Sequence, residues 1–232
     1  MVIDTPPRLC VFDAYGTLFD VAAAARRAAA EPGRAALAER WPQLAEAWRL
    51  KQLQYTWLRA ITGAHADFWT VTENGLDWAL EATGLDGDAE LRTRLLALYR
   101  ELDAYPEVPA VLDALRAGGR RTAILSNGSP EMLAAAVGSA GLGDRLDAVL
   151  SVEEVGVFKP ARAVYDLVGA RFGTPPDGVL FVSANGWDAA AATGHGFRTA
   201  WVNRAADPVD RLPWRPAHVV GDLADIPRLA GL

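Results

Sequence analysis

Short apolar runs recur along the chain and predict β-strands. The clear runs are Leu9 to Phe12, Thr122 to Leu125, Val179 to Val182 and Thr199 to Val202, and weaker candidates surround Val149 and Val219. Helical patterns separate the later runs, and they lie near Pro109 to Ala117, Pro130 to Ala140, Ala161 to Phe172 and Trp187 to Gly194. Strands that alternate with helices in this way predict an α/β fold with a doubly wound parallel sheet.

Two prolines support the predicted starts of helices. Pro130 follows a possible cap, Ser129, and Pro160 follows Lys159. The first turn of a helix tolerates proline because its N–H has no intrahelical partner there. We therefore expect helices to begin close to both prolines.

The segment from Phe19 to Ala104 breaks the alternation, because it contains no convincing strand and is rich in Ala, Leu, Glu and Arg. Its apolar residues fall at helical spacing in two groups. The groups are Leu50, Leu53, Trp57 and Ile61, and then Leu91, Leu95 and Leu98. We therefore predict a helical cap subdomain over residues 19–104, inserted into a core formed by residues 1–18 and 105–232.

Composition limits the possible partners. The chain has 232 residues, enough for one α/β domain with an insertion, and a net charge of -6 argues against non-specific nucleic-acid binding. We expect no signal peptide and no membrane span, because no basic segment precedes a long apolar stretch. The single cysteine, Cys10, cannot form an internal disulfide, which favours a cytoplasmic location.

Polar residues follow the predicted strands, where open α/β sheets gather their ligands. The candidates are Asp13 and Thr17 after the first strand, Ser126 and Asn127 after the second, Lys159 before a helix, and Ser183, Asn185 and Asp188 after the strand VLFV. A second carboxylate two residues after Asp13 would help to hold magnesium, but Tyr15 stands there and can instead form the wall of an organic pocket. This pattern favours a carboxylate nucleophile that works without a metal.

The segments FDAYGTLFD, WRLKQLQYTWLR, ILSNGSP, FKPARAVY and FVSANGWD occur in this order along nearly the whole chain. They resemble segments of the haloacid dehalogenase superfamily, and specifically of the type II L-2-haloacid dehalogenases. The aspartate strand and the lysine mark only the superfamily, which also contains phosphatases. Tyr15, the region around Arg49 and SANGWD mark the dehalogenase branch.

The resemblance implies a Rossmann-like core and an enzyme that converts short-chain (S)-2-haloacids to (R)-2-hydroxyacids and halide. Asp13 would displace the halide from C2 with inversion and form an aspartyl ester, which water then hydrolyses. Lys159 would keep Asp13 ionised and attract the substrate carboxylate. Arg49 and Asn127 would receive the departing halide. The resemblance also implies a homodimer, and we predict no cofactor.

The remaining candidates would support these steps. By the resemblance, Asn185 and Asp188 orient the water or hold Lys159, with Ser183 and Tyr165 in the same network. Ser126 would donate to the substrate carboxylate or the halide together with Asn127, and Thr17 belongs to the catalytic set. The predicted pocket wall consists of Tyr15, Leu53, Phe68 and Trp187. SANGWD lacks the leading acid that helps to bind magnesium in metal-dependent relatives, so we predict no metal ligands.

Two alternatives remain open. The first is a magnesium-dependent phosphatase of the same superfamily acting on a small phosphate ester, which Tyr15 and SANGWD oppose. The second is a non-catalytic protein that binds small acids, which the near-complete set of reactive residues opposes. Neither the preferred halogen nor the preferred chain length follows from the residues.

Overall fold

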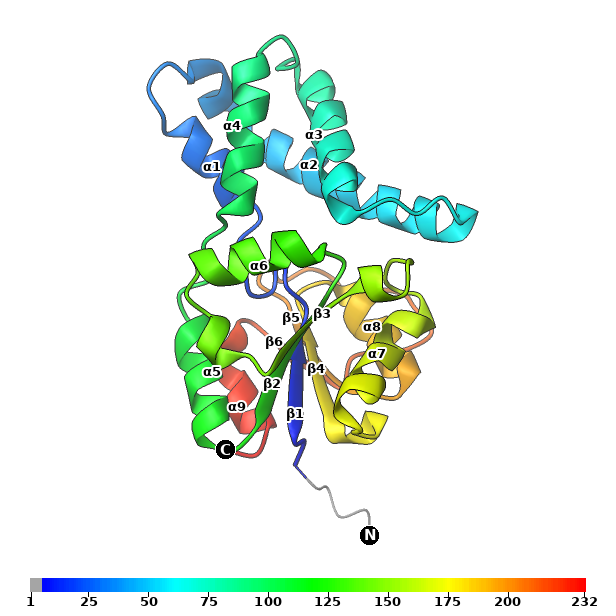
Figure 1. The fold of residues 1–232 in the computed structure, drawn as a ribbon. Helices are drawn as coiled ribbons and strands as arrows, with labels where there is room; N and C mark the ends of the chain where they lie inside the picture. The colour runs from blue at the N-terminus through cyan, green and yellow to red at the C-terminus, as the bar shows by residue number, and fades with distance from the viewer. Residues whose placement is uncertain (1–5) are drawn as a thin grey trace.

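The computed structural model describes residues 6–232 and contains one six-stranded parallel sheet within them (Figure 1). The strands are β1 (Leu9–Phe12), β2 (Arg121–Ser126), β3 (Ala148–Ser151), β4 (Val179–Ser183), β5 (Arg198–Val202) and β6 (His218–Val220). Their order is β3-β2-β1-β4-β5-β6, so the chain begins at the centre of the sheet and winds out toward both edges. The predicted doubly wound α/β fold is confirmed, including both weaker strands.

Helices cover both faces of this sheet. Helices α5 (Val108–Ala117) and α9 (Ile226–Leu229) lie on one face, and α7 (Arg162–Phe172) and α8 (Gly186–His195) lie on the other (Figure 1). Helix α6 (Pro130–Ser139) connects β2 to β3. Short 3-10 turns are η1 (Gly143–Arg145), η2 (Val152–Glu154), η3 (Pro176–Gly178) and η4 (Leu223–Asp225).

Helices begin close to both prolines, as predicted. Helix α6 begins at Pro130, and the Ser129 hydroxyl accepts a hydrogen bond from the Met132 backbone N–H at 3.4 Å. Helix α7 begins at Arg162, close to Pro160, but Pro160 lies before the N-cap Ala161 and not in the first turn. Pro160 belongs to the turn that carries Lys159 toward the sheet, where its fixed φ serves the turn instead of the helix.

Four helices between β1 and α5 gather beyond the carboxyl ends of the strands (Figure 1). They are α1 (Ala23–Ala29), α2 (Ala35–Thr62), α3 (Phe68–Thr83) and α4 (Ala89–Arg100). The chain enters and leaves this group at one place, where the Asp20 N–H donates to the Asp103 carbonyl at 3.0 Å. The predicted boundaries at 18/19 and 104/105 fall beside this pairing and stay a prediction. Residues 1–5 of the predicted core lie outside the described residues.

The helix expected from the spacing of Leu50, Leu53, Trp57 and Ile61 is present as α2, but these residues do not form its buried face. Leu50 is 60% exposed and Ile61 is 83% exposed, and Leu53 and Trp57 are half-buried. The inner face of α2 consists of Leu37, Leu44, Trp48, Gln52 and Thr56. The inner face therefore includes two polar side chains, and apolar ones are left outside. In α4, Leu91, Leu95 and Leu98 are buried, as their spacing predicts.

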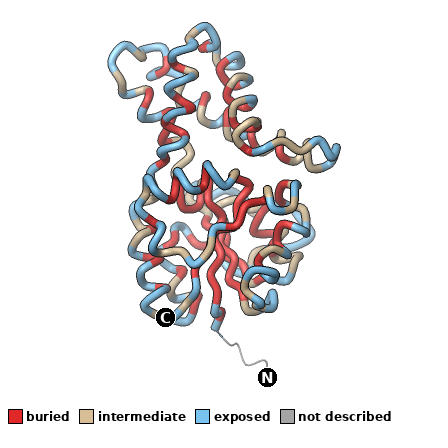
Figure 2. Tube along the Cα trace, viewed as in Figure 1, coloured by how far each residue is buried: buried red, intermediate tan, exposed pale blue. Residues whose placement is uncertain are grey.

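One contiguous hydrophobic core extends from the sheet into the helices above it. Figure 2 shows buried residues along the strands and along the inner sides of these helices. Burial raises the pKa of the Cys10 thiol in β1 to about 12, so this cysteine stays protonated inside the core. Across residues 6–232, no helix combines the length and the apolar character needed to span a membrane.

Candidate active site

Asp13 follows directly after β1, the strand that lies between β2 and β4. Its backbone N–H donates to the Val182 carbonyl at 2.9 Å and extends the pairing of β1 with β4 by one residue. The carboxylate is nearly buried. Its Oδ1 lies 3.1 Å from Lys159 Nζ, and its Oδ2 accepts from Asn185 Nδ2 at 2.8 Å and Thr17 Oγ1 at 3.2 Å. The nucleophile candidate is therefore fixed by backbone and side chain together.

The turn after Asp13 needs a glycine. Gly16 has φ +87°, a left-handed conformation that residues with a Cβ rarely adopt. The turn brings Thr17 back toward the sheet, where its Oγ1 also accepts from the Ala184 N–H at 2.8 Å. Thr17 thereby connects the loop after β1 to the loop after β4. Ser183, at the end of β4, places its hydroxyl 3.5 Å from Asp13 Oδ2 and accepts from the Asn185 N–H at 3.1 Å.

Lys159 forms a buried cation between two carboxylates. Its Nζ lies 3.1 Å from Asp13 and 2.8 Å from Asp188, and only 1% of the residue is exposed. Burial alone lowers the pKa of this ammonium group, but the two carboxylates outweigh burial and raise the pKa above its ordinary value. Lys159 therefore stays charged at neutral pH and places its positive charge 3.1 Å from the Asp13 carboxylate.

Asp188 has a second donor besides Lys159. The Tyr165 hydroxyl donates to Asp188 Oδ1 at 2.6 Å. Burial, together with the charge of Asp188, raises the pKa of Tyr165 well above its ordinary value, so Tyr165 is a neutral phenol. Burial also raises the pKa of Asp188 above its usual value, and Lys159 and Tyr165 oppose that rise. Lys159, Asp188 and Tyr165 form one buried network with Asp13.

The loop after β2 supplies Ser126 and Asn127. Asn127 Oδ1 accepts from the Lys159 backbone N–H at 2.9 Å, so its Nδ2 is the part of the amide that can donate to an anion. The Ser126 hydroxyl accepts from the Gly128 N–H at 3.0 Å. A Cβ at Gly128 would lie 2.8 Å from the Tyr15 ring, so a glycine is needed for the loop to approach that ring.

Arg49, from α2, reaches down to the loops of the sheet. Its NH2 group donates to the Tyr15 carbonyl at 3.1 Å and to Asn185 Oδ1 at 3.2 Å. Its NH1 group donates to Gln52 Oε1 at 3.0 Å. The guanidinium therefore connects the helices above the sheet to Asn185, which in turn donates to Asp13.

Aromatic rings surround Tyr15. Its ring is stacked on Tyr99 at a centroid distance of 5.7 Å with an interplanar angle of 17°, and its ring centroid lies 5.7 Å from that of Phe68. Burial raises the pKa of Tyr15 well above its ordinary value, with Tyr99 and Asp13 adding to the effect. Tyr15 is therefore a neutral wall residue. On another side of the site, Trp187 packs edge-on against Trp57 at 5.4 Å.

These side chains enclose one small cavity of about 10 Å³. Its lining consists of Asp13, Tyr15, Arg49, Leu53, Phe68, Ser126, Asn127, Lys159, Asn185 and Trp187. All eight predicted substrate contacts are therefore brought together. Thr17, Tyr165, Ser183 and Asp188 do not line the cavity. Thr17, Ser183 and Asp188 each hydrogen-bond to a residue that does, and Tyr165 hydrogen-bonds to Asp188. The cavity has room for about one water molecule, so the structure shows a closed site.

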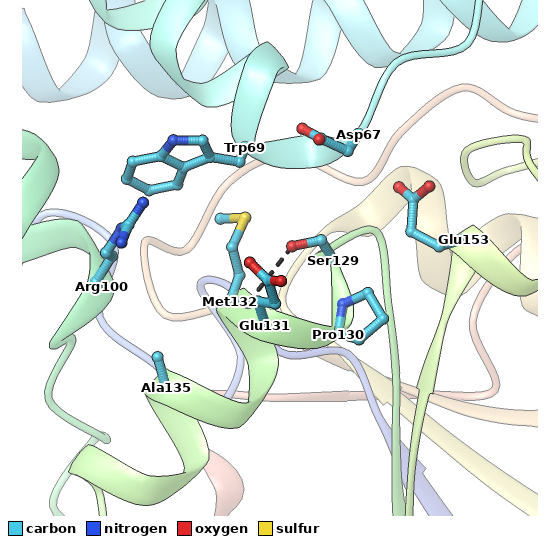
Figure 3. Close-up of a pocket in the computed structure, with 9 residues that line it drawn as sticks. All are labelled: Asp67, Trp69, Arg100, Ser129, Pro130, Glu131, Met132, Ala135 and Glu153. Atoms are coloured by element: carbon cyan, nitrogen blue, oxygen red, sulfur yellow. Dashed lines mark hydrogen bonds between the residues drawn. The ribbon is translucent and has the colours of Figure 1, made fainter.

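Larger cavities lie outside this site. Figure 3 shows a cleft of about 400 Å³ between α6 and the helices above it, in which Arg100 lies against the Trp69 ring and Ser129 caps α6. A second cavity, of about 540 Å³, is almost entirely apolar and shares Trp187 with the small one. Neither includes Asp13 or Lys159 in its lining, so we assign no chemistry to them.

Sequence reasoning missed three polar residues near Arg49, namely Gln52, Thr72 and Tyr99. Gln52 is buried, and its Nε2 lies 2.7 Å from Thr72 Oγ1 and 3.0 Å from the Tyr99 hydroxyl. The spacing of residues could have indicated that Gln52 is buried. Every fourth residue lies on the same face of a helix, and Gln52 stands between Trp48 and Thr56 at this spacing. Also unpredicted is a contact between the helices and the sheet side, where His65 Nε2 lies 3.0 Å from Glu153 Oε2.

In this site an aspartate carboxylate follows a central parallel strand and is paired with a buried lysine. This arrangement defines the class of hydrolases that use an aspartate nucleophile on this fold. Residues 7–196 match the family model of the haloacid dehalogenase-like hydrolases. The match covers β1 and Asp13, the helices above the sheet, Lys159 and all of α8. It therefore includes all of the candidate site.

Individual relatives are similar over nearly the full chain. (S)-2-haloacid dehalogenase 1 of Pseudomonas sp. (strain CBS-3) is 42% identical over 97% of this chain and 96% of its own length. Among solved structures, an L-2-haloacid dehalogenase is 41% identical with a TM-score of 0.90, covering 98% of this chain and all of its own. The structure of the L-2-haloacid dehalogenase from Xanthobacter autotrophicus with chloropropionic acid covalently bound is 38% identical, with a TM-score of 0.85. The alignment covers 97% of this chain and 98% of that one. The chain therefore belongs to the haloacid dehalogenase-like hydrolases, and within them to the (S)-2-haloacid dehalogenases.

Proposed function

We propose that this enzyme hydrolyses short-chain (S)-2-haloacids to (R)-2-hydroxyacids and halide through an ester on Asp13. The observation that carries the proposal is the convergence of Asp13, Lys159 and Arg49 on one closed cavity. The cavity thus combines a buried carboxylate, a cation that keeps it ionised, and a second cation for the departing anion. The similarity to a dehalogenase that binds chloropropionic acid covalently supports the same chemistry.

The two oxygens of Asp13 differ, and this difference selects the attacking atom. Oδ2 has Asn185, Thr17 and Ser183 within 3.5 Å, whereas the described residues place only Lys159 at Oδ1. Oδ1 therefore keeps a lone pair for attack on C2. As its bond to C2 forms, the carbon–halogen bond breaks and its electron pair leaves with the halide. Arg49 and Asn127 Nδ2 replace the hydration that the halide lacks in the closed cavity.

The second step releases the product. Water attacks Cγ of the aspartyl ester, the Cγ–Oδ1 bond breaks, and the 2-hydroxyacid leaves with Oδ1. The donors around Oδ2 stabilise the negative charge that develops there. Asn185 and Asp188 orient the water, and the raised pKa of Asp188 suits it to accept the water's proton. Ser183 and Tyr165 hold these two residues in place.

The site fits a metal ion poorly. The Lys159 ammonium already bridges Asp13 and Asp188, the two carboxylates that a divalent cation would need. Within residues 6–232, no three His, Cys, Asp or Glu side chains are grouped to hold a metal. The phosphatase alternative is accordingly less supported. We propose an enzyme that needs neither a metal nor another cofactor.

We further propose that residues 19–104 form a cap subdomain over a core of residues 1–18 and 105–232. Substrate entry requires the small cavity to open, and the paired backbone at residues 20 and 103 is the natural hinge.

We also propose a cytoplasmic homodimer that binds no nucleic acid and no membrane. Exposed apolar side chains such as Leu50 and Ile61 support a covering second copy, and sedimentation of Ile61→Ser against the unchanged chain tests it.

Halide release from (S)-2-chloropropionate tests the proposed reaction. We expect release in the presence of EDTA and none from Asp13→Asn. One turnover in water enriched in oxygen-18 should leave the label on Asp13, detectable by mass spectrometry of the active-site peptide. Dependence on magnesium, or hydrolysis of p-nitrophenyl phosphate in preference to haloacid, would favour the phosphatase. Haloacid binding without turnover or ester would favour the non-catalytic binder.

A further inference from the structure

We infer that Gln52, Thr72 and Tyr99 are positioning residues that set the guanidinium of Arg49 for departure of the halide. The inference rests on the proposed function and adds three residues that do not line the cavity. Two of them lie on helices other than that of Arg49, since Thr72 is in α3 and Tyr99 is in α4. Arg49 is therefore placed by the packing of three helices and not by α2 alone.

Thr72 fixes which way the Gln52 amide faces. The Thr72 hydroxyl donates its single hydrogen to the Phe68 carbonyl at 2.7 Å. At Gln52 it can therefore only accept, and the group 2.7 Å away must be the Nε2 donor. The opposite end of the amide, Oε1, then faces Arg49 NH1 at 3.0 Å. An amide turned the other way would place two donors against each other at Arg49.

The direction of hydrogen bonding is defined beyond Arg49 as well. A guanidinium only donates, so Asn185 must offer Oδ1 to Arg49 and its Nδ2 to Asp13 Oδ2. The chain of bonds thus leads from Thr72 through Gln52 and Arg49 to the nucleophile without an ambiguous link. Because each link has one allowed orientation, a change at Thr72 is transmitted to the guanidinium.

Tyr99 supports the same amide and also the pocket wall. Its hydroxyl lies 3.0 Å from Gln52 Nε2 and 3.2 Å from Gln52 Oε1, and its ring is stacked on Tyr15. Gly75, one turn after Thr72, allows the close approach of α3 to α2, because a Cβ there would lie 3.3 Å from the Gln52 backbone N. Helices α3 and α4 therefore hold the Gln52 side chain of α2 from two sides.

The leaving group provides a readout that separates positioning from general damage. A displaced Arg49 weakens stabilisation of the departing anion, and the poorer leaving group, chloride, depends on that stabilisation more than bromide does. We expect Gln52→Leu and Thr72→Val to lower kcat/KM for (S)-2-chloropropionate by about tenfold to a hundredfold, the size expected for one hydrogen bond to a charged group. The loss with (S)-2-bromopropionate should be smaller.

Thr56→Val is the matched control. Thr56 is buried on the same face of α2 and donates to a helix carbonyl, that of Leu53, at 2.7 Å, but it does not contact Gln52 or Arg49 through a hydrogen bond. It should keep the ratio of bromide to chloride turnover of the unchanged chain. Tyr99→Phe keeps the ring and loses only the hydroxyl, so it replaces Gln52→Leu if that variant fails to fold.

Bromide binding, followed by tryptophan fluorescence, tests the inference apart from turnover. We expect Gln52→Leu and Thr72→Val to bind bromide more weakly than Thr56→Val and the unchanged chain. Equal bromide affinity with an equal halide ratio in all variants would overturn the inference and leave the proposed function intact. An unchanged chain without haloacid turnover would overturn the proposed function, and the bromide affinities would still decide whether the three residues position Arg49.

Discussion

The two halves of the active site are built in different ways. On the sheet side, Asp13 and Asp188 follow strand ends, Lys159 bridges them, and all three are buried. On the helix side, Arg49 is half-buried and held by side chains from α2, α3 and α4. Asp13 thus has its cation, Lys159, without the helices, whereas the departing halide depends on the helices for Arg49. In this arrangement the sheet side prepares the attack, and the helix side supplies the group proposed to receive the halide.

The largest expected effect comes from the nucleophile itself. Asp13→Asn should lose all measurable halide release, because an amide cannot form the ester. Arg49→Lys keeps the charge but loses the planar fork, so we expect a loss of roughly a hundredfold and not of all activity. Halide release and thermal unfolding of both purified variants check this. Comparable residual activity in the two variants would contradict the division of roles between the halves.

Removing Lys159 should cost the most stability. Lys159→Met leaves Asp13 and Asp188 as two buried carboxylates without their cation, and breaking such a pair typically costs about 3–5 kcal/mol. Arg49→Met, at a half-buried position, should cost roughly 1 kcal/mol. Urea unfolding at neutral pH compares the two. A similar loss in both variants would show that the helix side is as rigidly built as the sheet side.

The loss of folding stability at alkaline pH tests the same contrast between the sheet side and the helix side. The pKa of Lys159 is raised in the folded protein, so its contribution is fully present below the unfolded value near 10.5 and is lost as pH rises through the folded pKa. The chain contains only two lysines, Lys51 and Lys159, so their side-chain signals can be assigned with one substitution. Nuclear magnetic resonance of labelled lysine should show Lys159 keeping its proton above pH 10.5, the ordinary value of a lysine side chain. Titration of Lys159 at or below that pH would refute the raised pKa.

Two glycines give the smallest predicted effect. Gly75→Ala places a Cβ 3.3 Å from the Gln52 backbone N, and such overpacking costs about 1–3 kcal/mol. Gly138→Ala, in α6 on the sheet side, meets no atom within 4 Å, and should stabilise by about 0.5 kcal/mol through the unfolded state. Chemical denaturation measures both. Opposite signs are the expected result, and a stabilising Gly75→Ala would mean that α3 can shift away from α2 at no cost.

The sheet side could be predicted from the sequence because strand order places its residues. A polar residue at the end of β1 must lie beside those at the ends of β2 and β4, so Asp13, Asn127 and Asn185 converge once the strands are recognised. Lys159 was a candidate from its place before a predicted helix, but its role, and the choice of Arg49, came from resemblance to a family. Their contacts with Asp13 and Asn185 became visible only in three dimensions.

The helix side was harder because hydrophobicity indicates the wrong face of α2. Leu50 and Ile61 suggest an inner stripe but are exposed, whereas Gln52 is polar but buried. The packing of α3 and α4 decides which face turns inward, and that packing is a property of three helices together. The hydrophobic pattern of α2 alone therefore cannot indicate which of its faces is buried.

The position of the termini has a practical consequence for handling the enzyme. The carboxyl terminus and the first residue of β1 both lie at the end of the sheet opposite the helices that cover Asp13 (Figure 1). A tag or a tether to a solid support at Leu232 would therefore face away from the helices that cover Asp13. The enzyme can accordingly be fixed to a resin by its carboxyl end and used in a flow reactor with these helices left uncovered by the support.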